Sequence, residues 1–195
     1  MYINAIYDAD LQNGEGVGVT LCVSGCPIKC PGCFNKEAQD SYFGQPCTNE
    51  QQEKVLYLLS REYIDHLSII GGEPFTKDKI KDIANLCLTV KRLWPHKKIW
   101  IWSGYTWENL YRMAFDMDCD MMRYQPDSWG FYEKKALRNI LFTIDVLVDG
   151  PFVQEQRDIT LKWRGSLNQR VIDVQKSLRQ TLPAFPASSP ILYCK

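Results

Sequence analysis

The chain has 195 residues, 45% hydrophobic and 24% charged, a composition typical of one globular domain of ordinary size. Lys plus Arg and Asp plus Glu both number 23, and this zero formal charge argues against a protein that holds nucleic acid through bulk positive charge. No apolar run approaches the roughly 20 residues of a membrane span, and residues 1–16 lack the basic and apolar regions of a signal peptide, so we expect a cytoplasmic protein without membrane or nucleic-acid partners.

The first predicted elements are a strand and a helix. Residues 16–25, GVGVTLCVSG, are β-branched and alternating, and they predict a strand that leads directly into a cysteine-rich loop. Thr48 and Gln51 have the spacing of a capping box, which predicts a helix through about Ser60. A short apolar strand is expected over residues 66–70.

The strand–loop–helix order then repeats. GGEP, residues 71–74, is followed by apolar residues at helical spacing, which predict a helix that ends before Pro95. A strand over 98–102 ends at SGY, residues 103–105, and another buried strand is expected over 144–150. This order predicts an α/β fold with a mostly parallel sheet and outer helices. Because ligands bind beyond the carboxyl ends of parallel strands, the cysteine loop, GGEP and SGY are expected to meet at one edge.

Two stretches do not fit this pattern. Residues 114–140 mix acidic, Met and aromatic residues without a clean period, and we interpret them as a partly helical insertion. Residues 176–195 include three prolines near the end and are expected to form an extended tail. We therefore expect one domain over residues 1–175.

Cysteine clustering is the strongest chemical signal. The chain has eight cysteines: Cys22, Cys26, Cys30, Cys33, Cys47, Cys87, Cys119 and Cys194. In a reducing compartment disulfides are rare, and clustered cysteines more often bind metal or do redox work. Cys26, Cys30 and Cys33 have the spacing C-x3-C-x2-C, which places three thiols on one short loop.

Three interpretations of this loop stay open from the residues alone. Structural zinc needs four ligands, and the fourth would have to be Cys22, Cys47 or His66. Three thiolates instead suit a [4Fe–4S] cluster with one iron left open to a small molecule, since an electron-transfer cluster takes four cysteines. The third possibility is that the loop holds neither.

A family resemblance adds to this reading. The segments that carry it are NGEGVGVTLCVSGCPIKCPGCFN (13–35), IIGGEPF (69–75), IWIWSGY (99–105), VLVDGPFV (146–153) and WRGSLNQ (163–169). In order and spacing they resemble the activating proteins of anaerobic (class III) ribonucleoside-triphosphate reductase, in the radical S-adenosylmethionine (SAM) superfamily. The resemblance covers about residues 1–113 and 141–172, and it implies an abbreviated, open partial (β/α) barrel.

The resemblance also implies the site residues. Cys26, Cys30 and Cys33 would ligate one [4Fe–4S] cluster per chain, whose open iron takes the amino and carboxylate groups of SAM. The other implied SAM contacts are Gly71, Gly72 and Glu73 at the methionine moiety, Gly32, Cys33 and Phe34 at the adenine, and Ser103 and Gly104 at the ribose. Asp149 is a further candidate near the same edge.

The implied function is that of a glycyl-radical-generating activase, a radical SAM oxidoreductase. A flavodoxin-type donor reduces the cluster, SAM is cleaved to a 5′-deoxyadenosyl radical, and this radical abstracts hydrogen from a C-terminal glycine of the reductase. No catalytic residue is implied beyond the cluster and SAM, and the chain is a candidate homodimer. Three alternatives stay open: an activase of another glycyl radical enzyme of the pyruvate formate-lyase type, a radical SAM enzyme acting on a metabolite, and a non-catalytic zinc-stabilised binding module.

Overall fold

The computed structural model describes residues 1–115 and 129–181. Within these residues seven strands form one sheet, and five α-helices pack against it. The strands are β1 Tyr2–Asp10, β2 Gly18–Val23, β3 Gln45–Pro46, β4 His66–Gly71, β5 Lys98–Trp102, β6 Val146–Asp149 and β7 Arg170–Asp173. The helices are α1 Asn49–Leu59, α2 Ile80–Leu93, α3 Trp107–Phe115, α4 Phe131–Thr143 and α5 Val174–Thr181, with short 3-10 helices η1 Glu37–Gln39 and η3 Gln154–Gln156.

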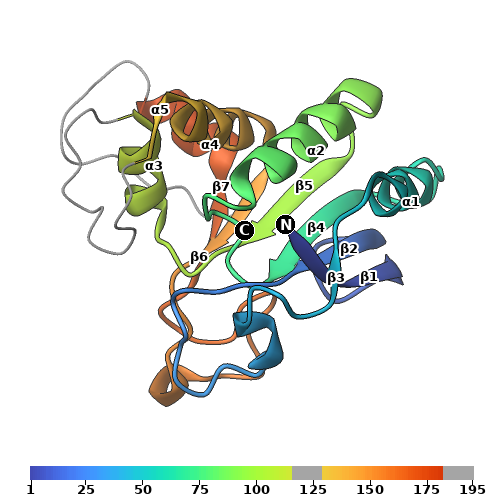
Figure 1. The fold of residues 1–195 in the computed structure, drawn as a ribbon. Helices are drawn as coiled ribbons and strands as arrows, with labels where there is room; N and C mark the ends of the chain where they lie inside the picture. Colours follow the sequence, from blue (N-terminus) through green and yellow to red (C-terminus); the bar gives the residue numbers. More distant parts are fainter. Residues whose placement is uncertain (116–128, 182–195) are drawn as a thin grey trace.

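The sheet is mixed, with the strand order β3-β1-β2-β4-β5-β6-β7 (Figure 1). The central strands β2, β4, β5 and β6 run parallel, as expected. The expectation of a mostly parallel sheet is wrong at both edges, where β1, β3 and β7 pair antiparallel. A parallel neighbour needs a crossover connection, usually a helix. Residues 11–17 are too short for one, and residues 150–169 contain no α-helix.

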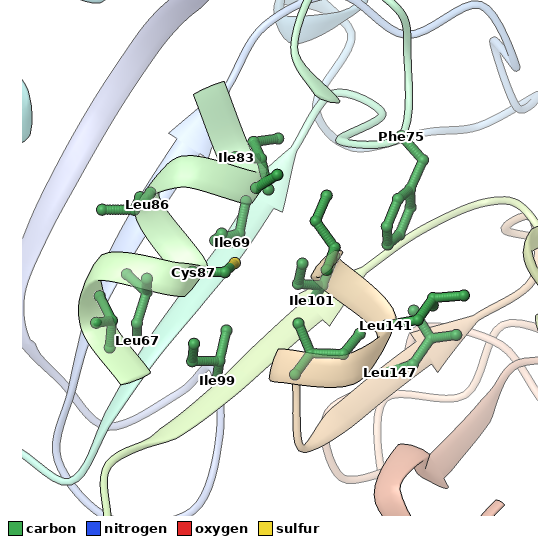
Figure 2. Close-up of a cluster of buried hydrophobic side chains, with 14 of the residues drawn as sticks. Leu67, Ile69, Phe75, Ile83, Leu86, Cys87, Ile99, Ile101, Leu141 and Leu147 are labelled. Atoms are coloured by element: carbon green, nitrogen blue, oxygen red, sulfur yellow. The ribbon is translucent and has the colours of Figure 1, made fainter. Parts of the chain in front are cut away.

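The main core lies between the helices and one face of the sheet. Strand residues alternate between the two faces, so every second residue of the central strands points to the helices. Figure 2 shows part of this core, with Ile69 of β4, Ile99 and Ile101 of β5, and Ile83 and Cys87 of α2. All five helices contribute buried apolar residues to it. The opposite face carries a smaller aromatic and valine cluster around Trp100.

Helix α1 begins where the sequence predicts. The Thr48 hydroxyl accepts a hydrogen bond from the Gln51 amide, and the Gln51 side chain accepts one from the Thr48 amide. This reciprocal pair satisfies two backbone donors that the first helical turn leaves without intrahelical partners. The capping box is therefore confirmed.

The structure changes the reading of the two irregular stretches. Helix α4 includes the end of the expected insertion, and its Leu137 and Ile140 are fully buried in the main core. The extended tail is corrected over residues 176–181, which belong to α5. Val174 and Leu178 lie on the same face of that helix and are buried, which stabilises a helix rather than an extended chain. Residues 116–128 and 182–195 lie outside the described residues.

Within residues 1–115 and 129–181, no helix is both long enough and apolar enough to span a membrane.

Candidate functional site

The cysteine loop leaves the end of β2 at a sharp turn. Gly25 has a φ of 87°, a left-handed conformation that glycine adopts without steric cost. Its amide donates to the Ala38 carbonyl at 2.8 Å, and the Cys26 amide donates to the Gln39 carbonyl at 3.2 Å. These bonds tie the start of the loop to η1. A turn closed by the Cys33 amide and the Cys30 carbonyl at 3.2 Å shapes its far end.

The three loop cysteines are free thiols, and each is partly exposed. Burial raises the pKa of Cys26 and of Cys30, while backbone N–H groups of Lys29 and Phe152, respectively, oppose that shift. The charge of Cys30 also acts on Cys26, and that of Cys33 on Cys30, so the thiols are electrostatic neighbours. Amide donors directed at sulfur are a known means of tuning iron–sulfur clusters. Three soft donors with such amides fit the ligand set of an iron–sulfur cluster.

The side chains considered as a fourth zinc ligand are engaged elsewhere. Cys22 is buried within β2. Cys47 accepts a hydrogen bond from Gln52 at 3.6 Å, and His66 Nε2 lies 2.8 Å from the Asn13 carbonyl oxygen. In the part of the chain that the structure describes, no three His, Cys, Asp or Glu side chains, the loop cysteines included, form a group that could hold a single metal ion as they lie.

The GGEP segment packs against the base of the cysteine loop. Gly71 ends β4 with a φ of 107°. The Gly72 amide donates to the Val23 carbonyl at 2.6 Å, and the Glu73 amide donates to the Gly25 carbonyl at 2.9 Å. A Cβ on Gly72 would lie 2.5 Å from that Gly25 oxygen, so the two loops meet backbone to backbone. Glycine is required here by close approach.

The Glu73 side chain joins GGEP to SGY. Its carboxylate is buried, and Oε1 accepts hydrogen bonds from the Phe75 amide at 3.0 Å and the Ser103 hydroxyl at 2.9 Å. Oε2 accepts from the Gly104 amide at 2.8 Å. Burial raises the pKa of Glu73 to about 7, although these hydrogen bonds favour the charged form. The expected meeting of the cysteine loop, GGEP and SGY is therefore confirmed.

The raised pKa of Glu73 predicts a pH dependence of stability. As the pH rises, the unfolded chain ionises Glu73 near the ordinary value of 4.5, whereas the folded chain keeps the proton until about 7. The free energy of unfolding should therefore fall between these two pH values and then level off. Glu73→Gln cannot titrate and should lack this fall, which urea denaturation of the metal-free protein would measure.

Glu133→Gln serves as the matched control for that measurement. A hydrogen bond from Lys81 lowers the pKa of Glu133, so this group adds stability that is lost as the pH falls. Its replacement should change the profile with the opposite sign and at lower pH. A wild-type protein whose stability falls no more than that of Glu73→Gln would contradict the prediction.

The other predicted site residues occupy different environments. Gly104 lies against the cysteine loop, since a Cβ there would come within 2.4 Å of Ile28 Cδ1. Phe34 is 96% exposed, so its side chain meets solvent. Asp149 does not face open space: it is buried, bonded to Arg170 Nε at 2.9 Å, and accepts from the Trp107 amide at 2.7 Å.

The connection between β6 and β7, residues 150–169, is a part of the site that periodicity misses. It lies beside the cysteine loop beyond the strand ends (Figure 1). Its Phe152 amide bonds to Cys30, and a Cβ on Gly32 would lie 2.2 Å from Gln154 Oε1. The Trp163 carbonyl accepts from Trp102 Nε1 at 2.6 Å, which fastens the connection to β5. In the sequence, this connection was indicated by the family resemblance of VLVDGPFV (146–153) and WRGSLNQ (163–169), two segments that include its ends.

Comparison with known proteins agrees with this arrangement. A family model described as a 4Fe-4S single cluster domain matches residues 12–172. The anaerobic ribonucleoside-triphosphate reductase-activating protein of Salmonella typhi is 35% identical over 88% of this chain and 97% of its own. The proteins of the same name from Escherichia coli K12 and Enterobacteria phage T4 are 34% and 32% identical over 88% of this chain, and 97% and 93% of their own. No solved structure matches the chain significantly. With residues 12–172 matching the 4Fe-4S single cluster domain, the chain therefore belongs to the family of anaerobic ribonucleoside-triphosphate reductase-activating proteins.

Proposed function

We propose that this protein is a radical SAM activase that generates a glycyl radical on anaerobic ribonucleoside-triphosphate reductase. One observation carries the proposal. The C-x3-C-x2-C loop is tied to GGEP and SGY at one end of the sheet, in a chain 35% identical to a protein with that activating name. Three clustered thiols beside backbone-lined loops suit a cluster with a small-molecule ligand.

The proposed ligands of the [4Fe–4S] cluster are Cys26, Cys30 and Cys33, which leave one iron free for the amino and carboxylate groups of SAM. The proposed SAM-lining residues are Gly32, Cys33, Phe34, Gly71, Gly72, Glu73, Ser103 and Gly104. Both Glu73 oxygens already accept hydrogen bonds from the protein. A carboxylate has about four lone-pair sites, so Glu73 keeps capacity for the amino group of SAM.

The chemistry comes from the cofactors. A cluster held by Cys26, Cys30 and Cys33 would supply one-electron transfer from a flavodoxin-type donor for the cleavage of SAM to methionine and a 5′-deoxyadenosyl radical, which would take hydrogen from a C-terminal glycine of the reductase. The chain binds and orients these groups and keeps water from them. Gly71 and Gly72 let GGEP lie close to the backbone of Val23 and Gly25. Glu73 holds Ser103 and Gly104 in register with the cysteine loop.

We also propose that the sheet is an abbreviated, open partial barrel of the radical SAM type. Support comes from the four parallel central strands, with all helices in the core on one face of the sheet. At the site edge, Phe34 is 96% exposed and Ile159 of the β6–β7 connection is 85% exposed. An open edge of this kind would admit a loop of a protein substrate, whereas a small metabolite would need a closed cavity.

The test of this function uses the wild-type protein reconstituted anaerobically with iron and sulfide. After reduction with dithionite, we expect release of 5′-deoxyadenosine from SAM. With the reductase added, we expect a glycyl radical in the electron paramagnetic resonance (EPR) spectrum. A radical on pyruvate formate-lyase instead would favour the alternative partner. A colourless protein that keeps zinc and releases no 5′-deoxyadenosine would overturn the proposal in favour of a binding module.

A further inference from the structure

Lys79 is a buried ammonium group that the proposed function does not use. It is the residue before α2, and only 1% of its surface is exposed. Its Nζ donates to Asp78 Oδ2 at 3.1 Å, and the Asp78 side chain is itself 57% exposed. Taking an ammonium group out of water costs several kcal/mol unless nearby negative charge offsets it. Asp78 bonds to Lys79 and the buried Glu73 carboxylate is a second nearby charge, so the ammonium group is a fixed positive charge inside the protein.

The ammonium group lies under the base of the cysteine loop. A Cβ on Gly25 would be 3.0 Å from Lys79 Nζ, and Gly25 directly precedes Cys26. The charge of Lys79 also acts on the Glu73 carboxylate, which in turn acts on Cys26 and on Cys30. Lys79 thus approaches the loop from the protein interior, on the side away from solvent.

We propose that the Lys79 ammonium group is a positioning charge that stabilises the electron-loaded state of the cluster and so raises its reduction potential. This inference rests on the proposed function. A [4Fe–4S]2+ core with three thiolates carries one negative charge. The electron supplied by a low-potential one-electron donor makes that two. A fixed cation in a poorly solvated region attracts the more negative state more strongly.

Two carboxylates act against this charge to different degrees. Asp78 is more than half exposed, so water screens its effect on the loop, whereas Lys79 is not screened in this way. Glu73 is buried and its charge acts on Cys26 and Cys30, so it opposes Lys79 at the loop without screening by water. Removing Lys79 would leave both carboxylates in place, so the effect of the ammonium group is the difference in potential between Lys79→Met and wild type.

The test measures the midpoint potential of the reconstituted cluster by EPR-monitored redox titration. Lys79→Met should shift the potential to a more negative value. Asp78→Asn removes a counter-charge that water screens, so it should shift the potential to a more positive value by less than Lys79→Met shifts it to a negative one. Lys81→Met is the matched control, because this lysine lies on the same helix, has 58% of its side chain exposed and pairs with Glu133. Its potential should equal that of wild type.

Each outcome decides the inference. An unchanged potential in Lys79→Met with a full iron content would overturn it, as would an equal shift in Lys81→Met. If Lys79→Met fails to assemble a cluster, Lys79→Gln replaces it: a negative shift supports the inference and no shift overturns it. Wild-type protein that holds no cluster would overturn the proposed function as well, whereas normal SAM cleavage with unshifted potentials would overturn this inference alone.

Discussion

Single replacement of Cys26, Cys30 or Cys33 by alanine is expected to abolish 5′-deoxyadenosine release from SAM. Each variant removes one of three thiolates on a loop that offers no spare sulfur, so the cluster should fail to assemble or should be lost on reduction. Iron and sulfide content, the visible spectrum and product release under anaerobic conditions measure these effects. Product should drop below detection in all three variants.

Cys22→Ala and Cys47→Ala are the matched controls, because they test whether a fourth cysteine ligates the cluster. Cys22 is buried in β2, and Cys47 lies beside α1, where Gln52 bonds to it. Both variants should keep the cluster and release product at rates close to wild type. Cluster loss in Cys47→Ala or Cys22→Ala would indicate a fourth ligand. Full activity in Cys30→Ala would contradict the proposed ligand set.

Gly71→Ala is expected to lower the free energy of unfolding by roughly 3 kcal/mol, the sum of two costs. Its φ of 107° is a backbone conformation that residues other than glycine rarely adopt, and a Cβ would lie 2.5 Å from the Val23 carbonyl oxygen. Because the obstacle is backbone, a rotamer change cannot relieve it. Urea denaturation would measure the loss, and cluster content after reconstitution should fall with it.

Two other glycines separate these costs. Gly72→Ala has no positive φ but would place Cβ 2.5 Å from the Gly25 oxygen. Gly150 has a φ of 96°, and a Cβ there would lie 3.7 Å from its nearest neighbour, Asn168 Nδ2. Gly150→Ala therefore strains the backbone without a steric clash. Each should cost less than Gly71→Ala, and only Gly72→Ala should also disturb the cysteine loop. If Gly150→Ala lowers the free energy of unfolding as much as Gly71→Ala does, the close contact between Gly71 and Val23 does not contribute to the loss.

Much of the fold followed from local patterns. The Thr48 capping box marks the start of α1, and the expected strand over 98–102 coincides with β5. The edge strands β1, β3 and β7 were not predicted, and neither was α5. Pairing direction depends on where a connection returns to the sheet, and periodicity along one segment does not report this.

The site was predictable in its chain positions but not in its contacts. Strand order alone brings the cysteine loop, GGEP and SGY to one edge. That the Glu73 carboxylate bonds Ser103 and Gly104, and that Asp149 is held by Arg170, depends on side-chain packing between distant segments. The burial of Lys79 could not be predicted from the sequence, because a lysine beside Asp78 just before a helix has the pattern of an exposed surface pair.

The hydrogen bonds that hold the three loops together use no cysteine sulfur. The Gly25 amide bonds to Ala38, the Glu73 amide to Gly25, and the Glu73 carboxylate to Ser103 and Gly104. The loops are thus joined to one another by backbone and carboxylate groups of the chain itself, whereas small zinc domains are joined through their metal.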